Sequence, residues 1–192
     1  MSPHLNTATR ATLANLFAII ALLILALTPW LLSESSIQMS RSLTLPRALN
    51  TRIPEGCHSM ALYVGYPGCN TECPRALSQI ALTLSERPNT GELCAVFLSM
   101  FPSLSEEATR YAQRFHPKLI DVTLPAQSLS SMLRQLGAEG SLSPDGTHKD
   151  LIYTLRKSSG DWTLTEATPA TQWSGERLGE VRSGRIDLKV TH

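Results

Sequence analysis

The sequence lacks any long run of lysine or arginine, and its 17 basic and 16 acidic residues leave a formal net charge of only +1. It therefore has neither the basic surface with which nucleic-acid-binding proteins hold phosphates nor a strongly acidic surface. It also lacks internal repeats and low-complexity tracts, which argues against a repeat architecture. We expect no nucleic-acid partner. A chain of 192 residues is long enough for one globular domain plus accessory segments.

Charged residues are absent from residues 11–33, and residues 13–32 are almost wholly apolar. Twenty helical residues span about 30 Å, the thickness of a hydrocarbon core. A cleaved signal peptide and a buried core helix are the alternatives. A signal sequence usually has a shorter apolar region that ends in small residues, whereas this one ends beside Trp30. We therefore expect an uncleaved, single-pass transmembrane helix at 13–32, after a short cytoplasmic N-terminus at 1–12.

Residues 33–56 are polar and rich in serine and arginine, which predicts a linker. Charge does not orient the membrane segment, because Arg10 lies on one side and Arg41, Arg47 and Arg52 lie on the other. The cysteines indicate on which side of the membrane the domain lies, since a small anchored domain with a redox-type cysteine pair is most useful outside the cytosol. We expect a protein of the inner (cytoplasmic) membrane whose domain faces the periplasm or the outside.

The remaining pattern predicts an α/β fold. Apolar runs and helical periodicity indicate strands at 60–66, 93–100, 119–122, 151–155 and 162–164, and helices at 74–87, 103–115 and 125–136. A βαβ crossover is right-handed, so the first two strands should lie close together and parallel. This order predicts a thioredoxin-like mixed sheet flanked by helices over residues 57–166. The signals fade in residues 167–192, which we interpret as a C-terminal tail.

Two cysteines stand where the first strand gives way to the first helix. The strand breaks between Gly65 and Gly68, Cys69 and Cys73 follow four positions apart, and the helical pattern begins at Pro74. Backbone N–H groups and the helix dipole at such a place stabilise a thiolate, the form that attacks disulfides and binds soft metals. The alternative is a fixed disulfide that only staples the turn. The position favours redox or metal chemistry.

The other two cysteines, Cys57 and Cys94, stand at corresponding entries to the first and second strands. Buried cysteines are often simply small apolar residues. If the two strands are parallel neighbours, however, the Cα atoms would fall within the roughly 4.4–6.8 Å that a disulfide requires. A structural disulfide and a pair of buried thiols are both consistent with the sequence.

The chain carries LYVGY at 62–66 before Cys69-x-x-x-Cys73-Pro74, VFLS at 96–99, FHPKLI at 115–120, and His148 ahead of LIYTL at 151–155. In this order the motifs resemble the SCO/SenC family of membrane-anchored, thioredoxin-fold assembly factors. Together these motifs extend over residues 59–164. The resemblance implies a thioredoxin-like fold and a role in assembling the copper centre of cytochrome c oxidase.

The resemblance also implies a copper site made of Cys69, Cys73 and His148. The chemistry agrees, because two thiolates suit soft Cu(I) and an added imidazole also suits Cu(II). Without the resemblance, His148 reads as an ordinary loop histidine. His58 is the reserve ligand, since it follows Cys57.

The resemblance makes the protein a copper chaperone rather than an enzyme in the strict sense. Its partner would be the copper-bearing subunit of cytochrome c oxidase or another copper chaperone. The chain departs from the family pattern at Asn70, where proline is usual, and at residues 100–105, which lack the usual acidic residues. A thiol–disulfide oxidoreductase with Cys69 and Cys73 as its catalytic residues therefore stays open, as does a scaffold without either chemistry.

Overall fold

The computed structural model describes residues 19–21, 37–87, 92–139 and 150–178. The chain divides into two units, residues 1–35 and 36–192. In the first unit the described residues, 19–21, are helical, and the rest of the transmembrane segment expected at 13–32 lies outside the described residues. No helix in the part of the chain that the structure describes is long and apolar enough to cross a membrane.

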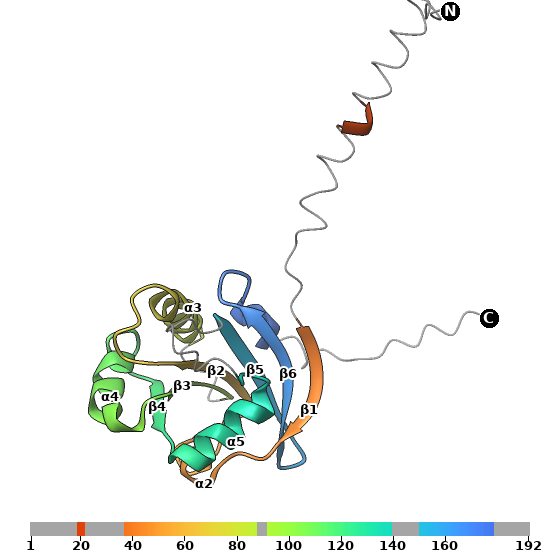
Figure 1. The fold of residues 1–192 in the computed structure, drawn as a ribbon. Helices are drawn as coiled ribbons and strands as arrows, with labels where there is room; N and C mark the ends of the chain where they lie inside the picture. The colour runs from red at the N-terminus through yellow and green to blue at the C-terminus, as the bar shows by residue number, and fades with distance from the viewer. Residues whose placement is uncertain (1–18, 22–36, 88–91, 140–149, 179–192) are drawn as a thin grey trace, which may run out of the picture. The chain divides into compact units, whose positions relative to one another are not determined.

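The second unit is built on a six-stranded mixed sheet with the strand order β1-β6-β5-β2-β3-β4 (Figure 1). The strands are β1 (Ile37–Leu43), β2 (Ser59–Gly65), β3 (Leu93–Ser99), β4 (Leu119–Thr123), β5 (Leu151–Ser158) and β6 (Asp161–Pro169). Strands β2, β3 and β4 run parallel, whereas β5 is antiparallel to both β2 and β6. The predicted mixed α/β sheet with adjacent parallel first strands is confirmed.

Helices cover both faces of this sheet (Figure 1). They are α2 (Arg47–Asn50), α3 (Glu72–Glu86), α4 (Ser105–Gln113) and α5 (Ala126–Leu136). One core cluster joins α3 and α4 to the face that carries Tyr63 and Phe97. The other joins α5 to the face that carries Leu62 and Val96. The continuous apolar runs in β2 and β3 arise because both faces of these strands are buried.

The expected linker at 33–56 is partly folded. Strand β1 pairs antiparallel with β6 at the edge of the sheet, and Leu49 of α2 is fully buried. The prediction failed because the strand register shifts between Gln38 and Arg41, which breaks the two-residue alternation by which a half-buried strand is recognised. The polar composition of this segment is that of an exposed edge strand rather than of a free tether.

The connection from β1 to α2 is held against α5 by a side-chain amide. The N–H of Thr44 donates to Oε1 of Gln135 at 2.9 Å, and Nε2 of Gln135 donates to the carbonyl oxygen of Thr44 at 3.3 Å. The glutamine thus offers Thr44 the donor and acceptor that a neighbouring strand would offer. This contact joins residues 91 positions apart in the sequence and holds the start of the segment 44–46 against the folded domain.

The C-terminal boundary expected at 166 also lies too early. Strand β6 continues to Pro169 because it has partners on both sides, β5 and β1. Beyond it, Trp173 and Leu178 are buried against the α3 face of the sheet, and the indole N–H of Trp173 donates to Oγ1 of Thr154 at 3.3 Å. The rest of the predicted tail, 179–192, lies outside the described residues.

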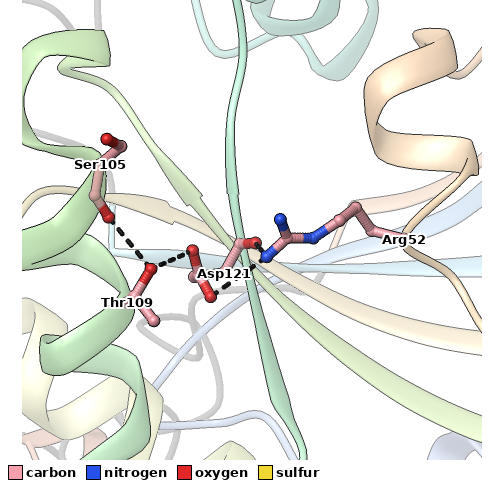
Figure 2. Close-up of polar contacts among 4 residues, drawn as sticks. All are labelled: Arg52, Ser105, Thr109 and Asp121. Carbon is pink, nitrogen blue, oxygen red and sulfur yellow. Dashed lines mark hydrogen bonds and ion pairs between the residues drawn. The ribbon is translucent and has the colours of Figure 1, made fainter.

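An ion pair secures the edge strand β4 (Figure 2). The guanidinium of Arg52 donates to the backbone carbonyl of Asp121 at 3.0 Å and lies 3.4 Å from its carboxylate. On the other side, the hydroxyl of Thr109 lies 2.7 Å from Oδ2 of Asp121 and 3.1 Å from the carbonyl oxygen of Ser105. Asp121 therefore ties α4 and the segment after α2 to the outermost strand.

Candidate functional site

The turn between β2 and α3 carries the two predicted site cysteines. The backbone N–H of Cys69 donates to the carbonyl oxygen of Tyr66 at 3.3 Å, which closes the turn. Gly68 has a φ of +96°, a conformation that side-chain-bearing residues rarely adopt. Helix α3 then begins at Glu72, so Cys73 lies in its first turn, as the sequence predicted.

The structure brings Cys69 and Cys73 together as reduced thiols. The backbone N–H of Cys73 donates to Sγ of Cys69 at 3.3 Å, and Sγ of Cys73 lies 3.9 Å from the carbonyl oxygen of Tyr66. Cys69 is 4% exposed and Cys73 is 0% exposed. Two soft ligand atoms therefore lie side by side at the end of a parallel strand, with Cys69 nearer the surface.

Gly65, the last residue of β2, makes room for one of these sulfurs. A Cβ at this position would lie 2.8 Å from Sγ of Cys73 and 3.1 Å from ring carbons of both Phe97 and Tyr63. From the sequence alone, Gly65 marks only the end of a strand. The signal that marks its role is glycine in an otherwise bulky buried strand, which commonly indicates close approach by another group.

Burial dominates the electrostatics of the site. Desolvation raises the pKa of the Cys73 thiol well above its ordinary value, and the hydrogen bond with the Cys69 side chain raises it further. Hydrogen bonds with the Tyr66 backbone and the Tyr63 hydroxyl lower this pKa, but by less. Burial thus outweighs the stabilisation of a thiolate that we expected from the helix N-terminus. Cys73 is therefore protonated at neutral pH until a cation or a partner sulfur replaces the proton.

Aromatic side chains line the thiol pair. Tyr63 and Phe97 lie beneath it, and Tyr111 of α4 donates its hydroxyl hydrogen to the carbonyl oxygen of Cys69 at 3.0 Å. On the outer side, Tyr66 packs edge-on against Phe101 with ring centroids 5.4 Å apart. The contact from Tyr111 could not be found from the sequence, because 42 positions separate it from Cys69.

The third predicted ligand, His148, lies outside the described residues. The neighbouring Asp150 has Oδ2 3.7 Å from Nη1 of Arg75 in α3. Within residues 37–87, 92–139 and 150–178, three metal-ligating side chains do not cluster anywhere, so the described part of the site is the cysteine pair. His58 precedes β2, whereas the thiols follow its last residue; a strand of this length separates them by about 20 Å. The structure therefore does not bring the reserve ligand to the thiols.

Cys57 and Cys94 are joined by a disulfide, with their Cα atoms 5.8 Å apart. The parallel register pairs Met60 of β2 with Cys94 of β3, and Cys57 lies just before β2. Both cysteines are buried, and Sγ of Cys57 lies 3.3 Å from the carbonyl oxygen of Ser59. The bridge ties the amino-terminal ends of β2 and β3, opposite the ends that lead to the thiol pair.

Comparison with known proteins adds a family and a fold. The family model described as SCO1/SenC matches residues 47–160. The copper-bound structure of Arabidopsis thaliana ScoI is 21% identical over 74% of this chain and 92% of that chain, with a TM-score of 0.51. Copper-bound ScoI of Bradyrhizobium japonicum is 20% identical over 74% and 94%, with a TM-score of 0.51. No curated protein gives a significant match.

A further solved structure is a SCO1/SenC family lipoprotein from Bacillus anthracis, 12% identical over 77% of this chain and 99% of that chain, with a TM-score of 0.54. At these identities the similarities establish the fold. The expected thioredoxin-like arrangement of a mixed sheet between helices is confirmed.

Proposed function

Because this chain belongs to the SCO1/SenC family, we propose that it binds one copper ion through Cys69, Cys73 and His148. The observation that carries the proposal is the pair of reduced, buried thiols at the start of α3, with Cys69 in the turn before the helix and Cys73 in its first turn. Thiolate ligands favour Cu(I), and imidazole adds affinity for Cu(II). ScoI proteins of similar fold have been solved with copper bound, which supports the same ligand chemistry here.

Of the two buried cysteines, Cys69 is the one nearer the surface. Cys73 is 0% exposed and Cys69 is 4% exposed, so a second protein's ligand would reach a shared ion from the Cys69 side. Copper is then cargo, and its binding releases the thiol protons. Delivery to the copper-bearing subunit of cytochrome c oxidase, or exchange with another copper chaperone, completes the proposed role.

The proposed location is the inner membrane, with the domain on the periplasmic or outer side and residues 13–32 as anchor. The support is the uncharged apolar segment in the sequence. A disulfide between Cys57 and Cys94 also fits an oxidising compartment. The Bacillus anthracis relative is described as a lipoprotein, which places that protein at a membrane.

A Cu(I) competition titration of the full-length chain against a coloured chelator tests the copper proposal. We expect one tight equivalent in the reduced protein, lost in Cys73→Ala and weakened in His148→Ala. His58→Ala is the matched histidine control and should bind as the wild type does. Absence of competitive binding by the wild-type chain would overturn copper carriage.

The hydrogen bond from Cys73 N–H to Cys69 Sγ favours a second candidate, thiol–disulfide exchange. A thiolate of one cysteine would attack a partner disulfide and form a mixed disulfide. The other cysteine would then displace the partner's sulfur, so the partner gains two electrons and this chain keeps a Cys69–Cys73 disulfide. Exchange should survive His148→Ala and fail in Cys69→Ala and Cys73→Ala, whereas a scaffold would tolerate all three changes.

A further inference from the structure

Tyr63 lies beside the sulfur of Cys73 in a space that Gly65 leaves open. Its Cε1, the ring carbon next to the one that bears the hydroxyl, and Sγ of Cys73 are both within 3.1 Å of the point where Gly65 would carry a Cβ. Tyr63 and Cys73 are each 0% exposed, so water does not compete for this contact. The Tyr63 hydroxyl and the Cys73 sulfur form a side-chain hydrogen bond.

The two sulfurs of the pair are held by different kinds of donor. Sγ of Cys69 accepts the backbone N–H of Cys73, which a side-chain substitution cannot remove. The hydroxyl of Tyr111 contacts the carbonyl oxygen of Cys69 rather than its sulfur. Of the Tyr63 and Tyr111 hydroxyls, it is therefore the Tyr63 hydroxyl that contacts a sulfur, the Sγ of Cys73.

We propose that Tyr63 is a positioning residue for the Cys73 sulfur, to which its hydroxyl donates a hydrogen bond in the reduced and the copper-loaded protein. The S–H of Cys73 points to the carbonyl oxygen of Tyr66, which leaves the sulfur's lone pairs for the hydroxyl. A donor fixed in a buried site stabilises thiol and thiolate sulfur more than a disulfide sulfur, because the disulfide is the weaker acceptor. The copper part of this inference rests on the proposed function, and the thiol part stands without it.

Tyr63→Phe removes the donor and keeps the ring that fills the core. In a glutathione equilibrium, the Cys69–Cys73 disulfide gains two electrons and two protons from two glutathione thiols, which become oxidised glutathione. Without the Tyr63 hydroxyl the reduced form loses stability, so the equilibrium should move toward the protein disulfide by about fivefold to tenfold. A tenfold change corresponds to about 30 mV for a two-electron couple.

The same substitution should weaken Cu(I) binding by about tenfold, the effect typical of losing a hydrogen bond to a metal ligand. Tyr153→Phe is the control that separates this effect from a general loss of packing, because it changes a buried tyrosine on the opposite face of the sheet. This control should keep the redox equilibrium within twofold of wild type.

Site-specific 3-fluorotyrosine at position 63 provides a test that preserves both ring and hydroxyl. The fluorine makes the hydroxyl a stronger donor, so the equilibrium should shift toward the reduced form, opposite to Tyr63→Phe. Equal equilibria in wild type, Tyr63→Phe and the fluorinated chain would overturn the inference. A shifted redox equilibrium in a chain that binds no copper would overturn the proposed function and leave the role of Tyr63 standing.

Discussion

Gly65 and Cys73 are in effect complementary: the hydrogen of the glycine faces the cysteine sulfur, and a methyl carbon in its place would lie 2.8 Å from Sγ. The sulfur cannot move away easily, since Cys73 is fully buried, and the added carbon would also lie 3.1 Å from ring carbons of Phe97 and Tyr63. The end of β2 therefore determines where one sulfur of the pair lies.

Gly65→Ala should displace the Cys73 sulfur. We expect a loss of about 1–3 kcal/mol in the free energy of unfolding, as for other overpacked sites. Cu(I) affinity should fall by about tenfold, because the sulfur leaves its position. Urea unfolding and chelator competition on the same samples measure the two effects. An alanine variant with wild-type stability and affinity would show that the sulfur position is adaptable.

The disulfide between Cys57 and Cys94 should stabilise the domain without contributing to the thiol site. It closes 37 positions of sequence, for which the chain-entropy model gives about 3–4 kcal/mol. We expect the double variant Cys57→Ser, Cys94→Ser to lose stability of this order in urea unfolding while it retains one equivalent of Cu(I). Loss of copper stoichiometry in a folded double variant would instead assign these cysteines to the metal.

Asp121 should matter more for stability than its ion pair alone implies. Its carboxylate is 13% exposed while Arg52 is 54% exposed, so solvent weakens the charge interaction, but the bond from Thr109 is short and partly buried. Asp121→Ala should cost about 1–3 kcal/mol in unfolding free energy, because it leaves Thr109 with one acceptor fewer and Arg52 without the carboxylate.

The matched control for Asp121 is the exposed pair of Arg134 and Glu139, whose atoms lie 3.1 Å apart with exposed fractions of 68% and 65%. Glu139→Ala should change the unfolding free energy by less than about 0.5 kcal/mol. Equal effects of Asp121→Ala and Glu139→Ala would show that the contact network of Figure 2 adds nothing to stability.

The sequence was most informative where local rules determine structure. Apolar runs predicted β2 and β3, and the cysteine spacing placed Cys73 in the first turn of α3, because strand burial and helix starts leave local signatures. Contacts between distant segments leave no such local signature in the sequence. Two examples are the hydrogen bond between Gln135 and Thr44 and the hydrogen bond between Tyr63 and the Cys73 sulfur. Both depend on how the folded chain packs, which a short stretch of sequence does not reveal.

A substitution at Trp173 can test how far the domain extends beyond the predicted boundary at 166. Its indole is 4% exposed, packs in the core that carries the thiols, and donates to Thr154 of β5. Trp173→Ala should therefore cost about 3–5 kcal/mol in unfolding free energy, through the cavity and the lost hydrogen bond. Leu82→Ala on the 54% exposed surface of α3 is the control and should stay within about 0.5 kcal/mol of wild type. If the two variants unfold at the same urea concentration, residues 170–178 are an appendage of the domain, and the boundary expected from the sequence would hold after all.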